Sequence, residues 1–241
     1  MASYTERRYE ISAFALKIIA ISAMTFNHIA NVFEDTLAPA IRVPFYAIGG
    51  LTFPIMAFMI VEGYHKTSNI KKYTLRLLIF GLIALIPFFL ALGGRLNVLF
   101  TLLLGLITLI IRDRMKNKTM FWFCVAGITL FTIFSDWSFI GVPLILAYGS
   151  VKGERRKIVL PVIAVSIVGI AISAIFSYIL GREPLQYILD GSFFLVCLGA
   201  IPLLLSYKGA RGYSPPSLRY LFYIYYPAHL LVIAGIAWLL L

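Results

Sequence analysis

Apolar residues fill almost the whole chain in long runs, which short polar stretches separate. Runs of about 20 apolar residues are typical of helices that cross a membrane. The pattern predicts an all-α, polytopic integral membrane bundle of about nine transmembrane helices, with eight or ten as alternatives, in a single domain over residues 1–241. The helices are expected over residues 11–33, 45–62, 73–92, 97–111, 119–135, 137–149, 158–180, 187–206 and 218–240.

The fourth and sixth of these segments, 97–111 and 137–149, are shorter than a straight crossing requires, so either could be a broken or re-entrant segment. Composition supports the membrane class, because 61% of the residues are hydrophobic and 13% are charged. The chain has no soluble-type phosphate loop, no pair of metal-ligand motifs and no nucleophile elbow. The chemistry of soluble enzymes is therefore not expected.

Positive charge alternates between successive connections. All Lys and Arg residues except Arg42, Arg95 and Arg182 fall in residues 1–17, 64–76, 112–118, 152–157 and 208–219. Because positive residues favour the inner side, this predicts a cytoplasmic N-terminus and a multi-pass protein of the cell membrane, as in a bacterial cytoplasmic membrane. The net charge of +11 then faces the cytosol. Membrane lipids with anionic headgroups or an anionic cytosolic ligand are the expected partners, and nucleic acid is not.

Lys17 and His28 are two ionisable residues inside the first apolar segment. Eleven helical steps make about three turns, so both side chains share one face and lie about 16 Å apart. Ionisable groups at membrane depth are costly and often mark function. For Lys17, an ion pair with Glu62, at a similar depth in the next helix, and a ligand-binding role are both open.

Other polar residues are expected near the same depths. Asn27, Arg95 and Asn97 could form one outer pocket with His28, although a helix-to-helix hydrogen bond for Asn27 and an interface anchor for Arg95 are the preferred separate interpretations. His229 is expected near mid-depth in the last helix, bonded to a neighbouring helix. The aromatic residues just before it suit an interfacial belt. These residues are Tyr220, Phe222, Tyr223, Tyr225 and Tyr226.

The spacing of Lys17 and His28 resembles the signature of membrane-bound acyltransferases, in which ten residues separate a basic residue from a histidine. More closely, the chain resembles the TraX family, associated with N-acetylation of pilin, over nearly its whole length. The shared motifs are Leu16 to Ala20 before His28, Phe53 to Ile55 with Glu62 and Gly63, Lys71 to Tyr73 with Arg76, Asn97 to Gly105, and Tyr226 to Leu230.

This resemblance implies transfer of an acyl group, most simply acetyl, from cytosolic acetyl-CoA or another acyl-CoA to an amine or hydroxyl at the outer face, without a metal. His28 is expected as general base, with an acyl-histidine intermediate as the rival mechanism. Asn27 or Asn97 would donate to His28 or to the oxyanion. Lys17, Lys71, Lys72 and Arg76 would hold the CoA phosphates, and Glu62, Arg95 and His229 the substrate.

The acceptor stays open among pilin or another exported peptide, a cell-envelope glycan and a lipid-linked amine, and so does an oligomeric state. A transporter or lipid flippase is the alternative function, in which Lys17, Glu62, His28 and His229 would line a polar path. A third alternative is an accessory membrane subunit without chemistry. In that case the addition of acyl-CoA should leave the thermal stability of the protein unchanged.

Overall fold

The computed structural model describes residues 10–213, 215 and 218–240, so the positive charges expected within residues 1–9 lie outside the described residues. The described part is helical throughout. Its elements are α1 (Ala13–Val32), α2 (Pro39–Ile48), the 3-10 helix η1 (Gly49–Leu51), α3 (Thr52–Lys66), α4 (Ile70–Ile83), α5 (Leu85–Leu92), α6 (Val98–Arg114), α7 (Lys118–Phe131), the 3-10 helix η2 (Thr132–Phe134), α8 (Ser138–Ser150), α9 (Arg156–Ile179), α10 (Pro184–Cys197), α11 (Ala200–Leu205) and α12 (Leu218–Leu240).

Local sequence explains where several helices begin. Ser12, Asn69, Asn97 and Asn117 precede α1, α4, α6 and α7, and each side-chain oxygen accepts a hydrogen bond from a backbone N–H of the first turn. Such caps satisfy donors that have no partner inside the helix. Most of the expected helical segments overlap single helices or joined pairs such as α4–α5 and α10–α11, whereas the segment 45–62 covers only part of the continuous stretch α2–η1–α3.

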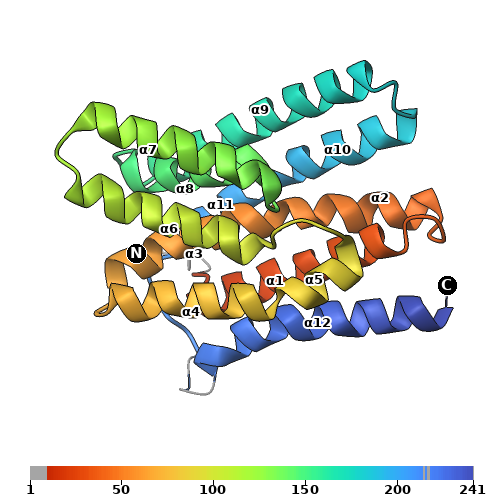
Figure 1. Ribbon diagram of the computed structural model, residues 1–241, viewed down its shortest axis with the longest axis horizontal. Coiled ribbons are helices and arrows are strands. Elements are labelled where there is room, and N and C mark those ends of the chain that lie inside the picture. The colour runs from red at the N-terminus through yellow and green to blue at the C-terminus, as the bar shows by residue number, and fades with distance from the viewer. Residues whose placement is uncertain (1–9, 214, 216–217, 241) are drawn as a thin grey trace, which may run out of the picture.

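The helices run side by side in one bundle (Figure 1). Helix α1 contacts α2, α3 and α12, and α10 packs against both α2 and α9, so α1 lies between the α2 and α12 layers. Helix α3 is at the centre, since most of its residues are buried and it contacts α1, α6 and α8. In this arrangement, one side of α1 packs along α12.

Within the described residues, five helical segments are long and apolar enough to cross a membrane: Ala13–Val32, Pro39–Lys66, Arg156–Ile179, Pro184–Leu205 and Tyr220–Leu240. A sixth results if the pair α4–α5, bent by 45°, counts as one span. The prediction of nine transmembrane helices is therefore not supported. The reason is length, because α6 has 17 residues and α8 has 13, which is short of the roughly 20 that a straight crossing needs.

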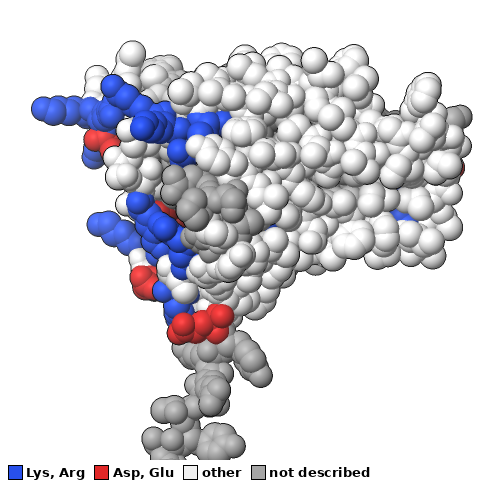
Figure 2. Space-filling view, turned by 90° about the horizontal axis from the view of Figure 1, so that it is seen from below, with Lys and Arg blue, Asp and Glu red and all other residues white. Residues whose placement is uncertain are grey.

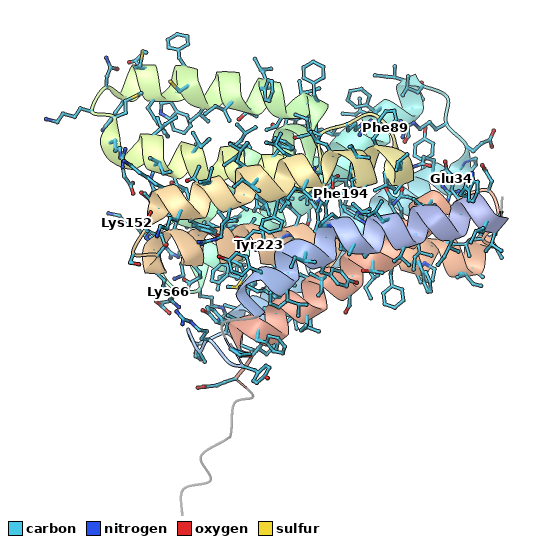
Figure 3. All side chains as sticks on the ribbon, turned by 60° about the horizontal axis from the view of Figure 1, so that its bottom comes forward. Glu34, Lys66, Phe89, Lys152, Phe194 and Tyr223 are labelled. Atoms are coloured by element: carbon cyan, nitrogen blue, oxygen red, sulfur yellow. The ribbon has the colours of Figure 1, made fainter. Side chains whose placement is uncertain are left out.

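Positive charge gathers at one end of the bundle (Figure 2). The connections α3–α4, α6–α7, α8–α9 and α11–α12 meet there (Figure 1). Lys66 and Lys152 are at this end, whereas Glu34 is at the opposite end (Figure 3). We call it the basic end. Its described Lys and Arg residues are Lys66, Lys71, Lys72, Arg112, Arg114, Lys116, Lys118, Lys152, Arg155, Arg156, Lys157, Lys208 and Arg211.

Close backbone contact joins η1 to α10. A Cβ atom added to Gly50 would collide with the backbone oxygen of Phe193, which cannot move aside as a flexible side chain can. We expect Gly50→Ala to lower the free energy of unfolding by about 1–3 kcal/mol, because overpacking forces backbone shifts. Thermal unfolding in detergent would measure the change. Gly127→Ala is the control, since an added Cβ there meets nothing; equal stability of the two variants would contradict the prediction.

Candidate functional site

Two histidines from distant parts of the chain meet between α1 and α12. The Nδ1 atom of His28 lies 2.9 Å from the Nε2 atom of His229, and the rings stack with their centroids 5.1 Å apart. Both side chains are buried. The Nδ1 atom of His229 lies 2.9 Å from the backbone oxygen of Tyr225, one turn earlier in α12. The pair is thus fixed from one side by the backbone of α12.

The hydrogen-bond partners assign the tautomers of the neutral rings. A backbone carbonyl can only accept, so Nδ1 of His229 must carry the proton, and its Nε2 must be an acceptor. Nδ1 of His28 then donates to that acceptor. The Nε2 atom of His28 is left with a free lone pair, since the one hydrogen bond of this ring among the described residues is made by Nδ1. An unprotonated imidazole nitrogen of this kind can take a proton or attack a carbonyl carbon.

Two tyrosines of α12 surround the pair. The ring of Tyr225 stacks on His229 at 5.0 Å, and its hydroxyl is 2.6 Å from Oγ1 of Thr25 on α1. The ring of Tyr226 lies 6.5 Å from His28 and 5.6 Å from His229. Sequence reasoning did not single out Thr25, and it assigned Tyr225 and Tyr226 to an interfacial belt, although Tyr226 belongs to a motif shared with the TraX family. The signal available was their position three and four residues before His229, which places them near its face of the helix.

Lys17 faces the same helix as His28. Its ammonium nitrogen lies 5.3 Å from the ring centroid of Phe222 on α12, a cation–π contact. We call the α1–α12 seam the set of Lys17, Thr25 and His28 on α1 with Phe222, Tyr225 and His229 on α12. These side chains connect the part of α1 nearest the basic end with the histidine pair.

The ion pair considered between Lys17 and Glu62 does not form. Glu62 instead pairs with Lys66, four residues later in α3, at 2.8 Å, and it accepts from the Tyr207 hydroxyl at 3.3 Å. The i,i+4 spacing makes Lys66 the nearer partner on the same helix. Glu62 therefore belongs to the basic end, away from the histidine pair.

The other expected phosphate ligands lie on α4. Lys71 and Lys72 are exposed in its first turn. Arg76, one turn deeper, holds its guanidinium over the ring of Tyr73 at 5.6 Å, and its Nε atom is buried without a hydrogen-bond partner. Tyr223 of α12, labelled in Figure 3, has Arg76 as its neighbour on α4. Arg76 and Lys17 thus both approach α12, from α4 and α1.

The two asparagines do not reach the histidines, which corrects the expectation that they act as donors there. Asn27 donates to the backbone oxygen of Tyr46 at 2.8 Å and holds α2 against α1. Asn97 caps α6 through Leu99 and donates to the backbone oxygen of Gly81 at 2.8 Å, with no exposed surface left. Arg95 is exposed before α6. The joint pocket considered for Asn27, Arg95, Asn97 and His28 therefore does not form. The preferred interpretation of Asn27, a helix-to-helix hydrogen bond, is confirmed by its contact with Tyr46.

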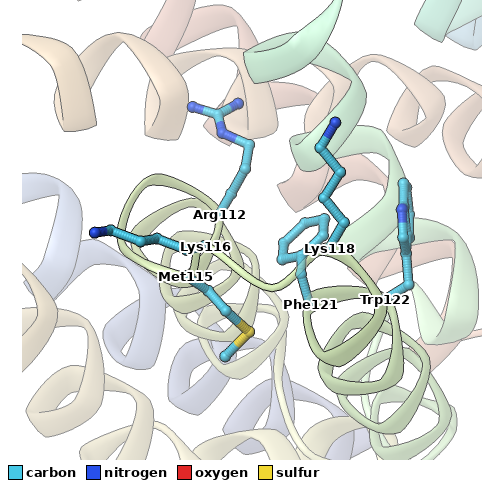
Figure 4. Close-up of a pocket in the computed structure, with 6 residues that line it drawn as sticks. All are labelled: Arg112, Met115, Lys116, Lys118, Phe121 and Trp122. Carbon is cyan, nitrogen blue, oxygen red and sulfur yellow. The ribbon is translucent and has the colours of Figure 1, made fainter.

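A concave region, separate from the histidine pair, lies at the basic end between the end of α6 and the beginning of α7 (Figure 4). It has a volume of about 290 Å³ and is lined by Arg112, Met115, Lys116, Lys118, Phe121 and Trp122. Its Arg112 is already engaged by Asp113 at 2.8 Å and by the backbone oxygen of Gly149 at 2.6 Å. This region is a basic surface feature with no direct contact to the α1–α12 seam.

The fold fits a multi-pass helical membrane protein, and the described residues hold a buried His–His pair between α1 and α12. The family described as TraX protein matches residues 12–237, and the chain belongs to that family. It is 30% identical over 251 residues to a protein of Dichelobacter nodosus named "Probable fimbrial assembly protein FimC, serogroup H1", covering 95% of this chain and 97% of that protein. No solved structure matches the chain.

Proposed function

We propose that the protein is a membrane-bound acyltransferase that transfers an acetyl or other acyl group from cytosolic acyl-CoA to an amine or hydroxyl at the extracytoplasmic side. The observation that supports this most directly is the free lone pair on Nε2 of His28, which His229 holds in position from the other side of the ring. A buried neutral imidazole with a fixed orientation is what general-base catalysis needs.

The distribution of charge gives the proposed orientation. Lys and Arg gather at the basic end, so we place that end in the cytosol, facing anionic lipid headgroups, and the loop with Glu34 outside. The N-terminal part of α1 then starts at the cytosolic side, in what we take to be the cytoplasmic membrane of a bacterium. This orientation puts Lys17 on the donor side and His28 closer to the acceptor.

In this proposal, positively charged side chains in the half of the bundle nearest the basic end bind the acyl-CoA. Lys17 and Arg76 are the two that enter the bundle, and neither is neutralised by an acid within ion-pair distance in the described residues. Phosphate oxygens would supply the missing anionic partners, with Lys71 and Lys72 at the entrance. The pantetheine arm would then follow α1 over the about 16 Å to His28.

The chemical step transfers one acyl group and one proton. The acceptor nitrogen or oxygen forms a bond to the thioester carbonyl carbon, and Nε2 of His28 takes the proton of the acceptor. When the tetrahedral intermediate collapses, the carbon–sulfur bond breaks and the leaving thiolate takes that proton from His28. The products are the acylated acceptor and free CoA, and His28 is again neutral.

The acceptor we propose is an exported peptide such as a pilus or fimbrial subunit. The support is the name of the Dichelobacter nodosus relative, which concerns fimbrial assembly. Cell-envelope glycans and lipid-linked amines present the same nucleophiles at the outer face. A peptide corresponding to the N-terminus of a pilin and an amino sugar are therefore the first two acceptors to compare.

Lys17→Met tests the proposed donor site, because methionine keeps much of the length and apolar surface but removes the charge. We expect acetyl-CoA to raise the melting temperature of the detergent-purified wild type, and this stabilisation to be lost in Lys17→Met. Lys118→Met at the basic end is the control for general charge loss and should retain it. No binding and no acetyl-CoA turnover in folded wild type would reject the acyltransferase and favour the transporter or flippase.

A further inference from the structure

The hydroxyl of Tyr226 is a buried polar group without a partner. The side chain is 3% exposed, and its oxygen makes no hydrogen bond among the described residues. Burying a hydroxyl without a hydrogen bond lowers the stability of the folded protein, so its presence indicates a functional role or a missing partner. Its ring touches the site, with centroids 6.5 Å from His28 and 5.6 Å from His229.

The Tyr226 hydroxyl faces the beginning of α6. It lies beside the backbone N–H of Val98, the first residue of that helix, without completing a hydrogen bond to it. Asn97 already satisfies the two following donors, since its side chain accepts from Leu99 at 3.1 Å and its backbone oxygen accepts from Phe100 at 3.0 Å. The Val98 N–H is directed toward the Tyr226 oxygen, which leaves the O–H of Tyr226 free to donate.

An unused O–H donor from α12 therefore lies at the histidine pair, close to the N-terminus of the 17-residue helix α6. The helix dipole at such a terminus favours negative charge. An O–H that has no acceptor in the described residues is complementary to an oxygen that becomes negative during a reaction.

We propose that the Tyr226 hydroxyl is the donor of an oxyanion site, which binds the carbonyl oxygen of the acyl thioester as the tetrahedral intermediate forms. This inference rests on the proposed acyl transfer. The acceptor attacks the carbonyl carbon while His28 takes its proton, and the carbonyl electron pair moves onto the oxygen that accepts from Tyr226. When the carbon–sulfur bond breaks, the pair returns to the carbonyl. Tyr226 keeps its proton throughout.

The charged neighbours of this site are Asp136 and Arg95. Asp136 follows η2 and lies near the Tyr226 hydroxyl, and its carboxylate accepts from the Trp137 N–H at 3.1 Å. Arg95 is close enough to Asp136 to offset its charge. A negative charge near the site opposes an oxyanion, so removing it should not impair the reaction. Asp136→Asn, which keeps an acceptor for Trp137, is expected to turn over at least as fast as wild type.

Tyr226→Phe is the central test, because it removes only the hydroxyl oxygen. We expect kcat for acetyl-CoA-dependent acetylation or hydrolysis to fall by about 100- to 1,000-fold, the usual loss for one oxyanion donor. The KM for acetyl-CoA should stay within a few-fold, and the melting temperature should not fall, since the hydroxyl has no partner to lose. Tyr148→Phe is the matched control: its hydroxyl is also buried without a partner, on α8, and its loss should leave kcat unchanged.

Each outcome bears on one proposal. Wild-type kcat in a folded Tyr226→Phe variant would overturn the oxyanion site and leave the acyltransferase standing. Equal losses in Tyr226→Phe and Tyr148→Phe would show a general packing effect and would also overturn it. A loss in Asp136→Asn as large as that in Tyr226→Phe would assign the chemistry to the acid instead. Absence of turnover in wild type, with no acetyl-CoA stabilisation, would remove the proposed function itself.

Discussion

Replacing His28 with alanine should reduce acetyl transfer from acetyl-CoA by about 1,000-fold or more, because general-base catalysis by a positioned side chain contributes about 100- to 10,000-fold. The free lone pair on Nε2 belongs to this residue alone within the histidine pair, since both nitrogens of His229 are engaged. Acetyl-CoA should still raise the melting temperature of the variant, because Lys17 and Arg76 are unchanged. Turnover of radiolabelled acetyl-CoA and thermal unfolding measure the two effects.

His65→Ala is the control for His28→Ala. His65 is exposed near the end of α3 at the basic end, and its loss should leave turnover unchanged. Full activity in a folded His28→Ala protein would contradict the assigned role. The same assay separates the two mechanisms, since label retained on the wild-type protein without acceptor, and absent from His28→Ala, would show an acyl-histidine intermediate instead of a general base.

Replacing His229 with leucine should lower kcat by about 100-fold or more and leave the KM for acetyl-CoA nearly unchanged. His229 accepts the Nδ1 proton of His28 and so fixes its tautomer and ring plane. Removing the residue that holds a catalytic histidine in the correct tautomer costs about 10,000-fold in the Ser-His-Asp triad. Steady-state kinetics with varied acetyl-CoA separates the two constants.

His229→Gln is the informative companion to His229→Leu, because glutamine can offer an oxygen acceptor near the former Nε2 position. It should restore part of the kcat that leucine loses. If both variants lose acetyl-CoA stabilisation while keeping the wild-type melting temperature without ligand, His229 takes part in binding the acyl donor. If both retain wild-type kcat, the tautomer assignment has no catalytic meaning.

Helical periodicity made part of this site predictable. Lys17 and His28 lie on one continuous helix, so their common face follows from eleven steps at 3.6 residues per turn, and the structure directs both toward α12. The gathering of Lys and Arg at one end could also be predicted, because the positive residues fall in every second connection between expected helices, and such connections lie at the same end of a bundle. The common face of α1 and the basic end therefore both follow from the order of residues along the chain.

Contacts between distant segments were not predictable in the same way. His28 and His229 are 201 residues apart, and their contact depends on α12 packing beside α1. Asn97 is a polar residue of a type that is common in active sites, but its side chain caps α6 and donates to the backbone oxygen of Gly81. A polar side chain in an apolar segment needs a partner, but the sequence does not say whether that partner is substrate, backbone or another helix.

The sequence by itself determined an all-helical chain whose apolar helices fit a multi-pass membrane protein, with a basic end and with a lysine and a histidine on one face of the first helix, because hydrophobic pattern and helical periodicity act locally. The tertiary structure decided the rest. Its described residues hold five or six candidate spans in place of the nine expected, Glu62 pairs with Lys66, and His229 and Tyr226 lie beside His28. Those outcomes depend on helix lengths and on long-range packing, which bring together groups that no local pattern relates.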